Sequence, residues 1–279
     1  MMLTRREFAS AAAGACVPQG APARRIVSLN PCLDVILAHV ADRGQIAALS
    51  HYARDPSSST IAAVARTLPY TYESAEEIIA LNPDLVLASV HSAPATRQAL
   101  ARLNIPVATF AVPNSVAESL AQIETVAGRI DRAARGAALI ARIRAAIAEA
   151  ERGATRRPIK ALVFQPRGLV AGSGTLTDEM LQRLGFENVA ARYGVAFWGN
   201  VPLESLIADP PELLLSSAPR PGARPYSERL LQHPALARLA HRMRRGVFPE
   251  ACLYCGGPVL LETTRALVAA REAFWAAGQ

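Results

Sequence analysis

The chain has 279 residues, a formal net charge of +7 at neutral pH and a hydrophobic content of 51%. This length predicts two domains, each large enough to bury a core of its own. The basic charge does not indicate nucleic-acid binding, because Lys160 is the only lysine, the arginines are scattered and aromatic residues make up only 5% of the chain. No segment beyond residue 23 has the charge-free apolar length of a transmembrane helix.

Residues 1–23 are predicted to be an export signal and not part of the fold. Thr-Arg-Arg-Glu-Phe at residues 4–8 precedes a short alanine-rich run, and Ala21-Pro22-Ala23 supplies the small residues that a signal peptidase needs. This segment resembles a twin-arginine signal, so we expect a periplasmic protein. Two alternatives are lipidation of Cys16, which lacks the usual large aliphatic residue three positions before it, and an N-terminus that is not a signal.

Residues 24–113 alternate short β-branched runs with helical segments, which is typical of a parallel sheet. The predicted strands are Ile26–Leu29, Ile46–Ser50, Leu85–Val90 and Val107–Ala111, and the predicted helices lie near residues 33–39, 60–66, 74–81 and 95–103. This block is interpreted as an N-terminal α/β domain.

Residues 114–153 are predicted to be a single linker helix. Small or apolar residues recur at helical spacing from Ser115 to Glu151, no proline interrupts them, and Ser115 with Glu118 has the spacing of a capping box. Such a helix would be about 55 Å long and would connect two domains. The alternative is two helices broken at Gly128 or Gly136.

Residues 154–279 repeat the alternation and are interpreted as a C-terminal α/β domain. Strands are predicted at Ala161–Gln165, Leu213–Ser217 and near Val247, with helices near residues 176–184, 202–208, 226–240 and 257–277. The predicted fold is therefore α/β, with two small Rossmann-like domains built on parallel sheets and joined by one rigid helix. Since ligands bind beyond the carboxyl ends of parallel strands, we expect a ligand cleft between the domains.

Three segments resemble one family of proteins. They are residues 25–31 (Arg-Ile-Val-Ser-Leu-Asn-Pro), residues 76–86 (Glu-Glu-Ile-Ile-Ala-Leu-Asn-Pro-Asp-Leu-Val) and residues 201–206 (Val-Pro-Leu-Glu-Ser-Leu). They are similar to the substrate-binding proteins of ABC importers for vitamin B12, iron-siderophores and haem, over nearly the whole chain after residue 23. The resemblance implies a periplasmic receptor whose rigid linker permits only small domain movements.

Glu76 and Glu204 occupy equivalent places, one in each domain, at the start of a helix that leads into a strand. The resemblance implies that these two glutamates pair with arginines of the membrane permease. A carboxylate in the first turn of a helix can also be explained by the helix dipole alone, which it stabilises by about 0.3 to 1 kcal/mol.

Aromatic side chains at strand ends are the best candidates for the cleft, because rigid faces with polar tips suit a planar macrocycle. Trp198 is expected in a loop, at a spacing from Glu204 that resembles the vitamin B12 receptor. Anchoring of loops is the other role that these aromatics could have. The predicted ligand-binding residues are Asn30, Pro31, Cys32, Tyr52, Arg54, Tyr70, Tyr72, His91, Phe164, Gln165, Trp198, Tyr254 and Cys255.

The cysteines leave several readings open. Cys252 and Cys255 have the Cys-x-x-Cys spacing of a redox pair or half of a metal site, although they lie near the C-terminus and not at the start of an early helix. Cys32 follows Asn30-Pro31 and could contact a ligand metal as a thiolate or be a small half-buried residue. His51 and His91 are too few for a zinc site.

Gly172-Ser173-Gly174 before a helix could bind a phosphate, but it lacks a phosphate-loop lysine, so a tight turn explains it better. The sequence as a whole predicts a binding protein and not an enzyme, with no cofactor or metal of its own. We expect it to deliver a corrinoid such as cobalamin to a membrane permease. The alternatives are a ferric-siderophore or haem receptor of the same shape and, in a different class, an exported thiol oxidoreductase.

Overall fold

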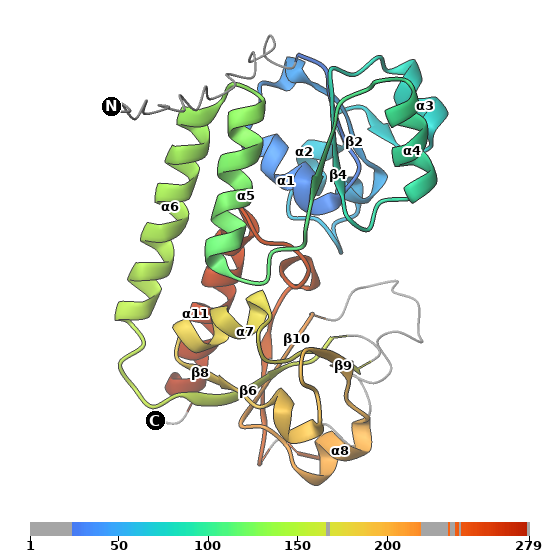
Figure 1. Cartoon of the computed structure of the whole chain (residues 1–279). Coiled ribbons are helices and arrows are strands. Elements are labelled where there is room, and N and C mark those ends of the chain that lie inside the picture. The colour runs from blue at the N-terminus through green and yellow to red at the C-terminus, as the bar shows by residue number, and fades with distance from the viewer. Residues whose placement is uncertain (1–23, 166–167, 219–233, 235–237, 240, 278–279) are drawn as a thin grey trace, which may run out of the picture.

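The computed structural model describes residues 24–165, 168–218, 234, 238–239 and 241–277. It forms two α/β lobes stacked one above the other, and the helices α5 (Val116–Arg129) and α6 (Ala133–Arg152) run along one side of both (Figure 1). The predicted fold of two parallel-sheet lobes is confirmed. No helix among the described residues combines the length and the apolar character that crossing a membrane requires. The predicted export signal lies outside the described residues.

The N-terminal lobe is a five-stranded sheet in the order β3-β2-β1-β4-β5, with every neighbouring pair parallel. Its elements are β1 (Ile26–Ser28), α1 (Pro31–Val40), η1 (Arg43–Gln45), β2 (Ile46–Ser50), η2 (His51–Arg54), α2 (Ala62–Ala65), β3 (Tyr70–Thr71), α3 (Ala75–Ala80), β4 (Leu85–Ser89), α4 (Pro94–Arg102) and β5 (Val107–Phe110). The three central strands, β2, β1 and β4, are almost fully buried, as expected of a parallel sheet covered on both faces, whereas the edge strands β3 and β5 are partly exposed.

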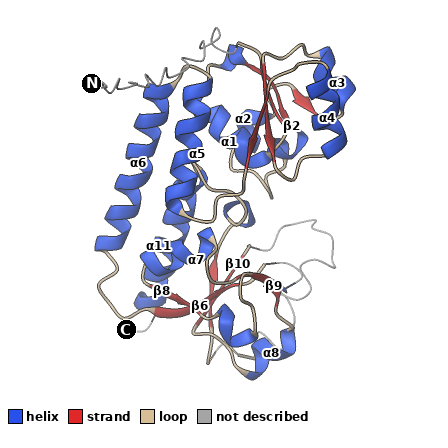
Figure 2. Cartoon of the chain, viewed as in Figure 1, coloured by secondary structure: helices blue, strands red, loops and turns tan. Residues whose placement is uncertain are grey.

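The C-terminal lobe has a four-stranded parallel sheet, β11-β10-β6-β8, and a separate antiparallel pair, β7 and β9. Its elements are β6 (Ile159–Val163), β7 (Leu169–Ala171), α7 (Leu176–Arg183), β8 (Phe186–Asn188), η4 (Ala190–Tyr193), β9 (Trp198–Asn200), α8 (Leu203–Ala208), β10 (Leu213–Ser216), β11 (Arg244–Val247), η5 (Glu250–Cys252) and α11 (Val259–Ala276). Figure 2 shows both sheets with helices packed around them.

The prediction of one helix from Ser115 to Glu151 is wrong. The helix stops at Arg129, and the chain reverses so that α5 and α6 lie side by side. Asp131 adopts a left-handed conformation (φ 57°), and the amide of Arg132 donates to the Ala127 carbonyl at 2.8 Å, which closes the end of α5. The single apolar stripe is thus two facing stripes, and each helix contacts both lobes, because α5 packs on α1 and α7 and α6 packs on α1 and α11.

Gly136 allows the close approach of these two helices. A Cβ atom at this position would lie 2.5 Å from the Cβ of Ala127, well inside van der Waals contact. The predicted cap at the start of α5 is present, because the Ser115 hydroxyl accepts from the amide of Glu118 at 3.1 Å. The Glu118 carboxylate, however, accepts from Asn114 instead of closing a capping box with Ser115.

One apolar core extends through both lobes, in contrast to the two separate cores that the length suggested. It includes Ile36 in the N-terminal lobe, Ile123 and Ile143 in the paired helices, and Leu213 and Leu267 in the C-terminal lobe. Smaller clusters pack on the outer face of each sheet. The helices α5 and α6 therefore act as a shared wall that holds the lobes together.

Several local predictions need correction. Trp198 lies in strand β9 and not in a loop, since its pairing with Ala171 of β7 places it in an antiparallel ladder. The two-residue strand β3 was not predicted because its run is too short to show periodicity. The strands β7 and β8, of three residues each, were missed for the same reason. The helix predicted near residues 226–240 falls almost entirely outside the described residues.

Candidate functional site

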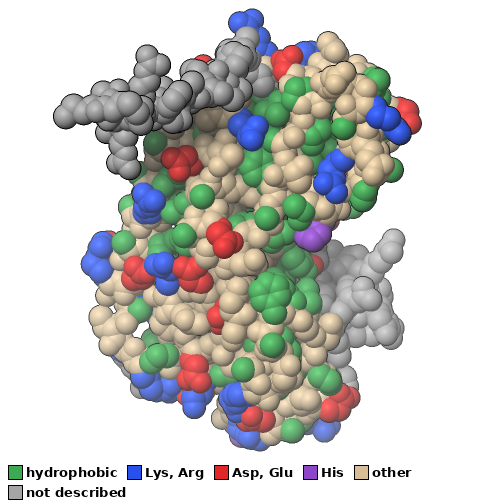
Figure 3. Space-filling view, viewed as in Figure 1, with side chains coloured by type: hydrophobic (Ala, Val, Ile, Leu, Met, Phe, Trp, Pro, Cys, Tyr) green, Lys and Arg blue, Asp and Glu red, His purple; other side chains and the backbone are tan. Residues whose placement is uncertain are grey.

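Polar and aromatic side chains follow the carboxyl ends of the strands in the N-terminal lobe. Asn30 follows β1, Tyr52 follows β2, Tyr72 follows β3 and His91 follows β4. Because these strands are parallel and adjacent, their carboxyl ends meet at one edge of the sheet, which is where open α/β sheets bind ligands. The space-filling view shows the surface indented between the two lobes (Figure 3).

Three of the four tyrosines predicted for the cleft come together in one cluster, in which the tyrosines are exposed and the other two side chains are half-buried. It is named here the tyrosine cluster and consists of His51, Tyr52, Arg54, Tyr70 and Tyr72. The His51 ring centroid lies 3.8 Å from that of Tyr52 and 5.0 Å from that of Tyr72, and Tyr70 meets Tyr72 edge to face at 5.5 Å. The Arg54 guanidinium lies 4.3 Å from the Tyr70 ring centroid. Tyr52, Tyr70 and Tyr72 are 49%, 41% and 64% exposed, which is unusual for large aromatic side chains grouped in this way.

Two acidic groups lie in this part of the lobe. Asp34 is fully buried, and burial raises its pKa to about 7, although its carboxylate accepts from the amide of Ser50 at 3.2 Å and from its hydroxyl at 2.5 Å. Burial also raises the pKa of Glu73, which has a left-handed backbone (φ 71°) and a buried oxygen without a hydrogen-bond partner among the described residues. Backbone strain of this kind clusters at functional sites.

Not every residue predicted for the site is free to contact a ligand. Asn30 caps α1 by accepting from the amides of Cys32 and Leu33, at 3.0 and 3.3 Å, and Pro31 occupies the first turn. His91 is exposed but makes no ring contact with the tyrosine cluster or with any other described residue. Asn30 and Pro31 therefore fix the start of α1, whereas the exposed His91 stays a predicted ligand contact.

The C-terminal lobe contributes exposed aromatics of its own. Phe197 and Trp198, at the start of β9, are 48% and 38% exposed, and Tyr254 is 44% exposed on the loop before α11. Phe197 was not predicted, although its position next to Trp198 could have indicated it. Phe164 and Gln165, in contrast, are fully buried, so neither offers an exposed face in this structure, and their predicted role in ligand binding stays a prediction.

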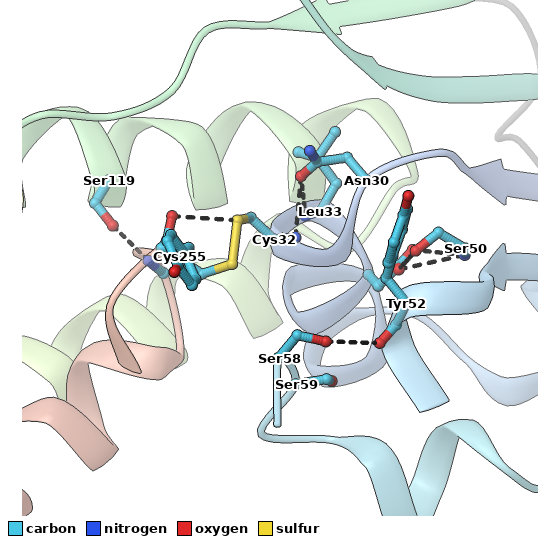
Figure 4. The surroundings of a disulfide bond; sticks show 12 residues. Asn30, Cys32, Leu33, Ser50, Tyr52, Ser58, Ser59, Ser119 and Cys255 are labelled. Carbon is cyan, nitrogen blue, oxygen red and sulfur yellow. Dashed lines mark hydrogen bonds between the residues drawn. A yellow bond between two sulfur atoms is a disulfide. The ribbon is translucent and has the colours of Figure 1, made fainter. Parts of the chain in front are cut away.

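The structure joins Cys32 and Cys255 in a disulfide bond between the lobes, with 5.1 Å between their Cα atoms (Figure 4). The bond links the first turn of α1 to the loop before α11. Neither sulfur is therefore a free thiolate for a ligand metal, and Cys252 with Cys255 is not a dithiol pair. Cys252 is a buried free thiol, and burial raises its pKa to about 11, which makes it unreactive.

Further contacts surround the disulfide. The amide of Gly257 donates to the Ser119 hydroxyl of α5 at 2.5 Å, and the amide of Val116 donates to Glu179 of α7 at 2.7 Å. A Cβ atom at Gly256 would lie 2.3 Å from the Ser119 hydroxyl oxygen. The start of α5 and the loop before α11 are thus tightly fitted, which fixes the lobes relative to each other on this side.

The two glutamates predicted for docking occupy matching positions. Glu76 lies in the first turn of α3 and Glu204 in the first turn of α8, and both side chains are exposed. The glycine pair before α7 is a tight turn, as preferred from the sequence. A Cβ atom at Gly172 would lie 2.7 Å from the Ala196 carbonyl oxygen, so the close approach of these two backbone segments requires a glycine there, and Gly174 has a left-handed backbone (φ 75°).

Comparison with known proteins agrees with this architecture. A family model described as "Periplasmic binding protein" matches residues 26–240. A haem-binding periplasmic protein of Roseiflexus sp. RS-1 has 28% sequence identity and a TM-score of 0.73, over 92% of this chain and 99% of that one. The vitamin B12-binding protein of Vibrio cholerae has 18% identity and a TM-score of 0.68, over 91% and 98% of the two chains.

A haem-binding periplasmic protein of Pseudomonas aeruginosa also shares the fold, with 21% identity, a TM-score of 0.72 and coverage of 89% of this chain and 92% of that one. No curated protein matches the sequence. Two parallel-sheet lobes that are joined by a rigid helical wall and carry exposed aromatics at strand ends define a two-lobed binding protein. The chain belongs to the periplasmic binding protein family.

Proposed function

We propose that this chain is the substrate-binding component of an ABC importer and that its cargo is a planar metal chelate, with ferric haem as the best fit. The observation that carries this proposal is the tyrosine cluster, in which three phenols are exposed and the Arg54 guanidinium packs over the ring of Tyr70. A phenolate oxygen is an established axial ligand of haem iron. A guanidinium binds carboxylates in a forked geometry, which suits the propionate groups of a porphyrin.

Tyr72 and Tyr70 are the candidates for the iron ligand. Tyr72 is the most exposed of the three phenols, and its pKa is raised, first by a hydrogen bond with Tyr70. An approaching ferric ion would replace the phenolic proton and so offset this effect, while Arg54 favours the charged phenolate. On the opposite lobe, Trp198 and Tyr254 offer aromatic faces against which the macrocycle could stack.

The likeness to the haem-binding protein of Roseiflexus, over nearly the whole of both chains, supports the proposal. The corrinoid predicted from the sequence remains the second candidate. The exposed indole of Trp198 would suit a corrin as well as a porphyrin, and the vitamin B12-binding protein of Vibrio cholerae has the same fold. A corrinoid, however, has no need of a phenolate from the protein.

Titration of purified protein (residues 24–279) with ferric haem, cobalamin and a ferric hydroxamate would test the cargo. We expect haem to bind most tightly, with the visible spectrum of phenolate-ligated ferric iron. The double change Tyr70→Phe, Tyr72→Phe should abolish that spectrum, whereas Tyr193→Phe in the other lobe should leave it unchanged. Tight cobalamin binding without haem binding would refute the haem proposal, and an unchanged spectrum in the double variant would refute the ligand assignment.

Trp198→Ala tests the contribution of the second lobe. Loss of an indole face from an apolar ligand surface, at roughly 25 cal/mol per Å², should weaken binding by about 2 kcal/mol, or about thirtyfold. In wild type, a bound porphyrin or corrin should quench Trp198 more strongly than Trp275, which lies in α11. Equal affinity and equal quenching in Trp198→Phe would remove this residue from the site.

A further inference from the structure

A second cavity lies at the far end of the C-terminal lobe. It is formed by the loop between α6 and β6 and by the last turns of α11, and Figure 1 shows these segments close together at the end of the molecule remote from the N-terminal lobe. Its volume is about 350 Å³, which lies within the range of small-molecule sites. We name it the basal cavity; the charged side chains in its wall are Arg156, Arg157, Arg271 and Glu272.

Arg271 is the best-held of these side chains. It is only 7% exposed, and its Nη1 atom donates to the carbonyls of Ala150 and Leu184, at 3.0 and 2.9 Å, at the ends of α6 and α7. Its Nη2 lies beside Gly153, where a Cβ atom would approach it to 2.8 Å. The side chain is therefore fixed before any ligand arrives.

The bonds to the two helix ends use only part of the hydrogen-bonding capacity of Arg271. A guanidinium has five N–H donors, and the two bonds from Nη1 leave Nε and Nη2 without a hydrogen bond to any described residue. No ion pair links Arg271 to a carboxylate within the described part of the chain. A nine-tenths buried cation with free donors at a cavity wall is an unusual arrangement, because buried charges are generally paired.

Two further arginines extend the wall. The guanidinium carbons of Arg156 and Arg157 lie 5.0 and 5.4 Å from the centroid of the Trp275 ring, so one indole positions both cations. Arg157 is also paired with Glu212 through bonds of 2.9 and 2.8 Å, which neutralise it. Arg156 makes no ion pair with a described residue.

We propose that the basal cavity binds a small oxyanion, a phosphate or carboxylate group, between Arg271 and Arg156. Two cations without a carboxylate partner face one carboxylate in the wall, Glu272, so the cavity is net positive once Arg157 is discounted. Charge-assisted bonds from a planar guanidinium are the ones that recognise such groups. The site is separate from the cleft and does not depend on the cargo proposed above.

The fluorescence of Trp275 provides an assay for anion binding. The chain has two tryptophans, so Trp198→Phe leaves Trp275 as the only one, stacked against the arginines. Inorganic phosphate, pyrophosphate and citrate would be titrated at constant ionic strength. We expect a saturable change in emission, and Arg156→Gln or Arg271→Lys should weaken binding at least about tenfold, which is the loss of one good charge-assisted bond. Arg102→Gln, on exposed α4, is the matched control.

Arg156→Gln keeps the test decisive if Arg271→Lys disturbs the helix ends, because Arg156 is exposed and outside the core. Co-sedimentation with phosphatidylglycerol vesicles and with phosphatidylcholine vesicles distinguishes a lipid headgroup from a free anion as the source of the oxyanion. A change in emission that tracks ionic strength alone, or that Arg102→Gln and Arg156→Gln reduce equally, would overturn the proposal. Absence of saturable binding to every anion and to both vesicles would overturn it as well.

Discussion

Replacing Cys32 and Cys255 by serine should greatly destabilise the folded chain. The disulfide joins residues separated by 223 positions. In the chain-entropy model such a cross-link removes about 18 cal/mol/K from the unfolded state, or about 5 kcal/mol at 25 °C, which is the upper end of the observed range. The bond should matter less for the relative position of the lobes, because the shared core and the contacts of Ser119 and Val116 remain.

Denaturant unfolding of protein spanning residues 24–279 measures this effect. We expect the double serine variant and reduced wild type to lose a similar free energy of unfolding, which separates the cross-link from the substitutions. Cys252→Ala, which retains the disulfide, is the control. Under denaturing conditions wild type should show one reactive thiol before reduction and three after it. Three thiols before reduction, or unchanged stability in the double variant, would refute the reasoning.

Other predictions follow from the core and the surface. Burial raises the pKa of Asp34 to about 7, so the folded state holds the Asp34 proton more tightly than the unfolded state does. The free energy of unfolding should therefore fall by up to about 4 kcal/mol as pH rises from about 4 through 7. Urea unfolding at a series of pH values measures this loss, which Asp34→Asn should lack. Gly136→Ala should cost about 1 to 3 kcal/mol by forcing α5 and α6 apart, whereas Gly128→Ala, which meets no atom within 4 Å, should be neutral or stabilising; equal thermal shifts would contradict this. Glu76→Ala with Glu204→Ala should leave cargo affinity intact and abolish stimulation of the importer's ATPase activity, and a loss of cargo affinity would instead place both residues in the cleft.

Parts of the candidate site were predictable because they depend on the order of short segments. Tyr52 and His91 follow the predicted strands Ile46–Ser50 and Leu85–Val90, and parallel strands bring their carboxyl ends to one edge whatever the details of packing. The burial of Phe164 and Gln165 could not be predicted in this way. Consecutive residues at a strand end face opposite sides of the sheet. The elements that pack on each side decide whether the side chain is buried, and the local sequence does not show which elements those are.

The amino-acid sequence by itself determined the two parallel-sheet lobes, because the alternation of apolar runs and helical segments records locally which faces must be buried. Only the tertiary structure decided that the chain reverses after Arg129, since the turn uses a left-handed Asp131 where a glycine would have marked it. The same holds for the bond between Cys32 and Cys255. Pairing across 223 residues depends on where the paired helices place the lobes, and no local pattern carries that distance.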